Sequence, residues 1–124
     1  MAIKMIGLNH YPIAVSGLQK SLAFYHQVLG MDLLPRPDFN FSVAWLDCGN
    51  GISLHLILQE DIMVNQSGSR HLHFAFTMSD ILQTKNELIN QGIRMVKNIK
   101  PRPDDKLQMF IQDPDDNYAE LTEL

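Results

Sequence analysis

The chain has 124 residues, of which 45% are hydrophobic and 19% charged, and its formal net charge is −4. This length and composition predict one globular domain that buries roughly two thirds of its unfolded surface, and the negative charge argues against a nucleic-acid partner. The apolar runs are far shorter than the ~20 residues that cross a bilayer, and the amino terminus lacks the pattern of a signal peptide. We therefore expect no membrane partner and a cytoplasmic location.

The first half of the chain predicts one helix and four strands. Residues 7–15 alternate as a strand does, and Ser16 with Gln19 forms a capping box that opens a helix. Gly30 is placed to end that helix. Three further strands are expected at about 31–38, 41–47 and 52–59, the last two joined by the hairpin sequence Gly49-Asn50-Gly51.

The same order of elements then begins again. Residues 60–70 read as a connector, polar towards its end. A strand at 71–78 is followed by a helix at about 80–91, with Ser79 as its cap and Gly92 at its end. Further strands are expected near 93–99, 106–112 and 118–123, with Asp113-Pro114-Asp115-Asp116-Asn117 as the turn before the last.

The two halves match in register as well as in order. His10 and His73 are 63 residues apart, and His55 and Glu120 are 65 apart. Such a register indicates duplication of one unit. The prediction is an α+β fold of two repeated βαβββ modules, about 5–59 and 70–124, which form a curved mixed sheet with the helices on its outer face.

Each of these four residues falls on one predicted side of its strand. Side chains alternate across a strand, and the bulky apolar neighbours occupy the other positions, as Leu54 and Leu56 do beside His55. The four polar side chains are therefore expected on the face away from the helices. Burying three imidazoles and a carboxylate there would be costly without a neutralising partner, and His and Glu suit zinc, iron, nickel, cobalt or manganese. A metal site, a histidine-rich pocket for an apolar ligand, and no site at all remain open from the spacing alone.

Several runs of residues resemble the vicinal oxygen chelate superfamily, which includes glyoxalase I, fosfomycin-resistance thiol transferases, extradiol dioxygenases and bleomycin-resistance proteins. They are Gly7-Leu8-Asn9-His10, the runs Ser21–Tyr25 and Val28–Met31, Leu72-His73-Phe74-Ala75-Phe76, and the run Phe110–Leu121. The resemblance implies paired βαβββ modules around a divalent metal ion, with a homodimer completing the site. It also implies that His10, His73 and Glu120 are metal ligands.

The fourth ligand position is where the chain departs from glyoxalase I, because His55 stands where that enzyme has a glutamate. Glu120 could still act as both ligand and catalytic base, and His55 is either a fourth ligand or an acid/base. The favoured expectation is a metal-dependent lyase or isomerase that stabilises an enolate of a small oxygen-chelating substrate. Fosfomycin transfer is set aside, because Pro12 replaces a hydroxyl residue and no arginine follows Glu120 near the end of the chain.

Two other functions remain as alternatives. Two histidines and one carboxylate, His10, His73 and Glu120, also form the ligand set of an extradiol ring-cleaving dioxygenase. A binding protein of the bleomycin-resistance type would need no metal, and the retained ligands argue against it.

Other residues receive weaker predictions. The candidate pocket residues are Trp45, Phe39, Phe41, Tyr118 and Met109. The run Lys100–Lys106 is expected to be a solvated loop rather than a lid over an anionic substrate. His26 is expected to be exposed and His71 to support His73, while Cys48, the single cysteine, is expected to have no role.

Overall fold

The structure is a computed structural model, and it describes residues 2–38, 42–61 and 67–124. The chain divides into two compact units, residues 1–62 and 63–124. Among the residues that the structure describes, no helix has the length and apolar character needed to cross a membrane. The predicted pocket residues Phe39 and Phe41 lie outside the described part of the chain.

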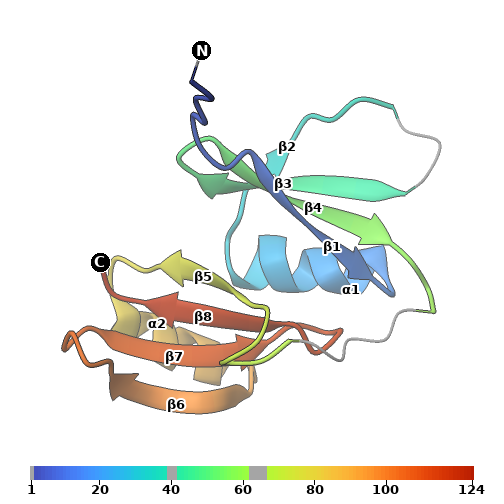
Figure 1. The fold of residues 1–124 in the computed structure, drawn as a ribbon. Helices are drawn as coiled ribbons and strands as arrows, with labels where there is room; N and C mark the ends of the chain where they lie inside the picture. Colours follow the sequence, from blue (N-terminus) through green and yellow to red (C-terminus); the bar gives the residue numbers. More distant parts are fainter. Residues whose placement is uncertain (1, 39–41, 62–66) are drawn as a thin grey trace. The chain divides into compact units, whose positions relative to one another are not determined.

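The first unit is a four-stranded mixed sheet with a helical segment (Figure 1). Its elements are β1 (His10–Val15), α1 (Leu18–Leu22), the π-helical segment η1 (Ala23–Val28), β2 (Leu33–Leu34), β3 (Val43–Gly49) and β4 (Ile52–Leu58). The strand order is β1-β4-β3-β2, in which β1 runs parallel to β4 and the other neighbours are antiparallel.

The second unit repeats this arrangement. Its elements are β5 (Phe74–Thr77), α2 (Ile81–Asn90), β6 (Met95–Pro101), β7 (Leu107–Gln112) and β8 (Tyr118–Thr122). The order β5-β8-β7-β6, with β5 parallel to β8, is the topology of the first sheet. The predicted α+β fold of two βαβββ modules is therefore confirmed.

The register of the parallel strand pairs also repeats. In the first sheet Pro12 pairs with His55, so His10 lies two residues before the partner of His55. In the second sheet Ala75 pairs with Glu120, so His73 lies two residues before the partner of Glu120. Each histidine therefore has the same diagonal relation to the polar residue on the neighbouring strand.

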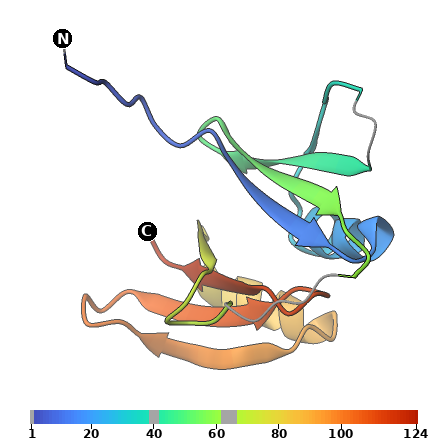
Figure 2. The same ribbon diagram turned by 45° about the vertical axis from the view of Figure 1, so that its right-hand side comes forward.

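Each sheet buries one face under its own helix, as both views show (Figures 1 and 2). The side chains on this face alternate with those on the other face, because a strand has a two-residue period. The buried residues on this face include Ile13, Val15, Leu46, Leu54 and Leu56 in the first unit and Met109, Ile111, Ala119 and Leu121 in the second. Met109 is fully buried among them, so its assignment to a pocket was wrong.

The helix starts differ from the predicted caps. Gly17, which has no side chain, occupies the N-cap of α1, so the predicted capping box of Ser16 and Gln19 is one residue out of register. Asp80 rather than Ser79 caps α2, and its carboxylate accepts a hydrogen bond from the Gln83 N–H at 3.1 Å. With Asp80 as the N-cap, the next residue, Ile81, lies in the core at 3% exposure.

The helix ends and tight turns follow the sequence pattern. Gly30 and Gly92 have φ angles of 77° and 75°, a region that favours glycine at a helix end. The hairpin between β3 and β4 uses positive φ angles at Gly49, Asn50 and Gly51. In the turn before β8, the Asp113 carboxylate accepts from the N–H groups of Asp115 and Asn117.

Three strands are clearly shorter than predicted, and the first of them, β1, begins at His10 rather than at residue 7. β2 contains only Leu33 and Leu34, because Pro35 and Pro37 lack the N–H donors that a longer strand would need. β5 begins at Phe74 rather than at residue 71, and Leu72, which precedes the strand, is 62% exposed.

Candidate functional site

His73 and Glu120 form a close pair in the second unit. The Nε2 atom of His73 lies 3.1 Å from Oε1 of Glu120. Glu120 is only 9% exposed, and it is held in β8 between β5 and β7. The predicted ligands of this unit are therefore brought together, although they are 47 residues apart in the chain.

The other nitrogen of His73 determines which atom is available for binding. Nδ1 lies 2.9 Å from the carbonyl oxygen of Gly68 and 3.0 Å from that of His71. A carbonyl oxygen only accepts hydrogen bonds, so Nδ1 carries a proton. The Nε2 atom then faces the Glu120 carboxylate and requires either a proton or a metal ion between them, since a lone pair and a carboxylate repel each other. Carbonyl acceptors on the far nitrogen are the usual support of a metal-binding histidine.

Arg102 contacts the same carboxylate. Its Nη1 atom is 3.6 Å from Oε2 of Glu120, while its Nε and Nη2 atoms donate to Asp104 at 3.1 and 2.8 Å. The hydrogen bonds from Arg102 lower the pKa of the Asp104 carboxyl, and the same contact raises the pKa of Arg102. The expectation of a solvated loop was thus wrong for Arg102. Its guanidinium contacts Glu120, which lies 18 residues later in the chain.

Aromatic side chains border this pair. The ring of Phe110, paired opposite Glu120 on β7, meets the His73 ring edge-on with centroids 5.4 Å apart. Tyr118, a predicted pocket residue, lies near Phe110 with centroids 6.2 Å apart. Phe110 is buried at 4% exposure and limits the access of water to one side of His73.

In the first unit, the rings of His10, His55 and Trp45 form a stack. The His55 ring lies parallel to that of His10 at 4.2 Å and parallel to that of Trp45 at 4.2 Å, with interplanar angles of 7° and 4°. Trp45 pairs with His55 across β3 and β4, and His10 extends the stack from β1. The two predicted metal-binding histidines of this unit are therefore in contact.

The stack restricts what these histidines can bind together. The lone pair of an imidazole nitrogen lies in the plane of the ring, so a metal ion held by two rings must lie close to both planes. The nearly parallel planes of His10 and His55 allow no such position. In this arrangement at most one of the two can bind a given ion.

Hydrogen bonds hold both rings. His55 Nε2 lies 2.9 Å from the Ser53 hydroxyl, and His10 Nδ1 lies 2.8 Å from Oδ1 of Asn9. Burial, followed by the charge of His10, lowers the pKa of His55. The imidazole of His55 therefore holds a proton less readily than a free histidine side chain does.

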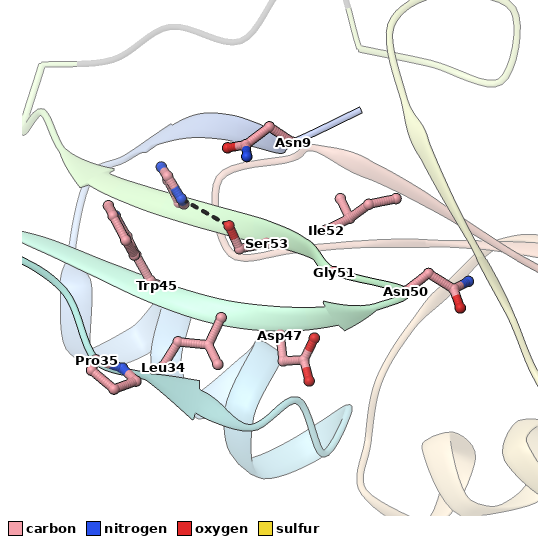
Figure 3. A pocket seen from close by; sticks show the side chains of 10 residues that line it. Asn9, Leu34, Pro35, Trp45, Asp47, Asn50, Gly51, Ile52 and Ser53 are labelled. Atoms are coloured by element: carbon pink, nitrogen blue, oxygen red, sulfur yellow. Dashed lines mark hydrogen bonds between the residues drawn. The ribbon is translucent and has the colours of Figure 1, made fainter. Parts of the chain in front are cut away.

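A surface pocket of about 520 Å³ opens beside the stack within the first unit. Trp45 and His55 line it together with Ser53 and Asp47, and Figure 3 shows the hydrogen bond that joins Ser53 to the imidazole. The prediction that Trp45 is a pocket residue agrees with this position. Within the described residues of either unit, no three His, Cys, Asp or Glu side chains gather as a metal-binding group. The four predicted ligands form two pairs, one in each unit.

Comparison with known proteins identifies the family. The sequence profile of the Glyoxalase/Bleomycin resistance protein/Dioxygenase superfamily matches residues 7–121. The chain belongs to this superfamily.

Several members of the superfamily are similar to the chain over most of their length. Metallothiol transferase FosB of Lysinibacillus sphaericus is 32% identical over 92% of the chain and 79% of its own length. Lactoylglutathione lyase of Neisseria meningitidis is 30% identical over 87% of the chain and 83% of its own length. The crystal structure of a glyoxalase family protein from Enterococcus faecalis covers 95% of the chain and 98% of its own, with a TM-score of 0.77 and 25% identity. These similarities do not test whether this glyoxalase-superfamily chain transfers a thiol, so setting that activity aside stays a prediction.

Two other histidines of this superfamily member differ in their surroundings from the prediction. His26 is half-buried, and its Nδ1 donates to the Met31 carbonyl at 2.6 Å, so the expectation that it is exposed was wrong. His71 has an exposed side chain, and its backbone carbonyl is the group that contacts His73. Neither feature was visible in the strand and helix periodicity, because both depend on turns that fold back on the chain.

Cys48 is expected to react slowly with thiol reagents. Burial and the neighbouring Asp47 carboxylate raise the pKa of the Cys48 thiol above its ordinary value, so a smaller fraction is thiolate at pH 8. Alkylation by iodoacetamide should be several-fold slower than that of a cysteine peptide and should accelerate above pH 9. Asp47→Asn should increase the rate, since it removes the second cause. A rate equal to that of the peptide at pH 8 would contradict the assignment of Cys48 as an unreactive strand residue.

Proposed function

We propose that this protein is a metal-dependent lyase or isomerase of the glyoxalase I kind, acting on a small substrate with two neighbouring oxygen atoms. The observation that carries the proposal is the His73–Glu120 pair, whose facing atoms are 3.1 Å apart while two carbonyls hold the far nitrogen of the imidazole. This arrangement orients one nitrogen and one oxygen donor before any ion binds.

The donor set fits a divalent ion. We propose His10, His73 and Glu120 as ligands, because nitrogen and carboxylate donors suit zinc, nickel, cobalt, iron and manganese. A bound ion would supply Lewis-acid stabilisation of the oxyanion that forms when a proton leaves the carbon beside a carbonyl. The identity of the metal is an outcome of the experiment below.

The residues around the ligands supply the proton transfers in this proposal. Glu120 takes the proton from the substrate carbon, and the Arg102 guanidinium near Oε2 orients the carboxylate. His55 serves as a second acid/base rather than as a ligand, because its ring is parallel to that of His10 and the two cannot share an ion. Ser53 holds the imidazole in position through the hydrogen bond at 2.9 Å.

One observation supports a second candidate function. If His55 is not a ligand, the remaining set of two histidines and one carboxylate has the composition used by oxygen-dependent iron enzymes. The parallel rings of His10 and His55 therefore also favour an extradiol-type dioxygenase. In either case we propose that the protein acts as a homodimer, which light scattering after gel filtration would test.

Activity with defined metals should separate the two candidates. Apoprotein is loaded in turn with zinc, nickel, cobalt, manganese and, without oxygen, iron. We expect isomerisation of the hemithioacetal of phenylglyoxal and a neutral thiol with at least one metal other than iron, and no oxygen uptake with catechol. Oxygen uptake confined to the iron form, without isomerisation, would support the dioxygenase. Failure to bind any of these metals would reject both proposals and leave a metal-free binding protein.

A further inference from the structure

The pocket beside the ring stack has the size of a small-molecule site. Its volume of about 520 Å³ lies within the range of about 300–1,000 Å³ that is usual for such sites. The residues that line it come from the loop before β1 and from β2, β3 and β4 with their connections. They are Asn9, Leu34, Pro35, Trp45, Asp47, Asn50, Gly51, Ile52, Ser53 and His55.

The lining is apolar beside Trp45 and polar along the strands towards the hairpin. Leu34 pairs with Trp45 across β2 and β3, so their side chains share one face of the sheet, and Pro35 follows Leu34 at the same edge (Figure 3). Asp47 and Ser53 are paired across β3 and β4, two positions along from the pair of Trp45 and His55. A ligand in the pocket therefore contacts an apolar surface beside Trp45 and a polar surface beside Asp47 and Ser53, two residues further along the strands.

The only charged side chain that lines the described pocket is negative. Asp47 carries the only carboxylate among the described lining residues, and neither lysine nor arginine lines the pocket. One oxygen of Asp47 accepts from the Gly49 N–H at 2.8 Å, which holds the half-buried carboxylate in place. An anionic group placed here would meet a like charge without a compensating cation, whereas a hydroxyl or ammonium group would donate to the carboxylate.

We propose that this pocket binds the body of the substrate, as a flat ring packed against Trp45 with a neutral or cationic donor group directed at Asp47. The inference deepens the proposed function by naming the class of substrate, because His55 lies at the junction of the two surfaces. It predicts selection against anionic ligands.

Trp45 is the only tryptophan of the chain, so it provides a direct test. Its indole N–H gives a single resonance in a ¹H–¹⁵N correlation spectrum, which needs no further assignment. Three probes share a phenol ring and differ in the charge of the side group, namely tyramine, tyrosol and 4-hydroxyphenylacetate. Each is titrated into metal-free protein, and the shift of the indole resonance is measured.

Tyramine and tyrosol should shift the indole resonance saturably, and 4-hydroxyphenylacetate should bind at least tenfold more weakly. Asp47→Asn should bring the affinities for tyramine and 4-hydroxyphenylacetate to within about twofold of each other, while the matched variant Asp61→Asn, at an exposed site outside the pocket, should keep the tenfold difference. The unchanged remainder of each spectrum shows that the variants are folded.

Two results would overturn the inference: no saturable shift with any probe, or equal affinity of the wild-type protein for the cationic and anionic probes. The failures of this inference and of the proposed function are distinguishable. Protein that binds metal but none of the probes contradicts only the pocket assignment. Protein that binds the probes but no metal contradicts only the metal-dependent activity.

Discussion

The double variant His73→Ala/Glu120→Ala should lose bound metal. The wild-type protein, purified without chelators or a histidine tag, should hold about one divalent ion per site. Removing two of the three proposed ligands should weaken binding by well over 100-fold, because loss of a mere supporting residue already costs about 10–100-fold. Elemental analysis of both proteins, before and after reloading with metal, measures this difference.

The matched control for this experiment is His71→Ala. This side chain is exposed, and its contact with the His73 imidazole is made through the backbone carbonyl, which alanine retains. The control should therefore keep the metal content of the wild type. Equal and negligible metal in wild type and double variant, even after reloading, would reject the metal site, and loss of metal in His71→Ala alone would show that the imidazole of residue 71 is a ligand.

Replacing His55 by phenylalanine should separate catalysis from metal binding. The phenyl ring preserves a flat surface between His10 and Trp45 but removes both nitrogens. Because His55 is proposed as an acid/base and not as a ligand, the metal affinity should stay within about threefold while turnover of the hemithioacetal falls by about 10²–10⁴-fold. Metal titration and initial rates on the same preparation provide the two readouts.

Ser53→Ala is the companion variant, since it leaves the imidazole in place and removes only its hydrogen-bond partner. It should lower turnover less than His55→Phe does and should leave metal affinity unchanged. If His55→Phe lowers metal affinity by tenfold or more together with turnover, His55 is a ligand, and the parallel stack must open when the ion binds.

The duplicated fold could be predicted because it depends on local patterns in the sequence. Glycine is favoured where a helix ends in a residue with positive φ, and Gly30 and Gly92 occupy such positions in both copies. The alternation of apolar and polar side chains predicted that His55 and Glu120 lie on the face opposite the helices. Successive side chains of a strand point to opposite faces, so the buried positions determine which face the others occupy. Equal spacing in two homologous modules then implied equal register, which the pairings of Pro12 with His55 and Ala75 with Glu120 confirm.

Local patterns did not predict the start of a helix correctly where either of two adjacent residues could serve as its N-cap. Ser16 and Gly17, or Ser79 and Asp80, can each precede a helix, and the choice depends on which following residue enters the core. The length of β2 was overestimated because Pro35 and Pro37, which follow Leu34, end the pairing.

By itself, the sequence determined the repeat and the strand faces, because these depend on spacing along the chain, and the four candidate ligands followed from those faces together with the resemblance to the superfamily. Only the tertiary structure decided which of them touch: His73 with Glu120, and His10 with His55. It also decided that Arg102 reaches Glu120 and that Trp45 stacks on His55. These contacts join residues on different strands and loops, and their distances and ring angles depend on strand register and turn geometry, which no single segment of the sequence specifies.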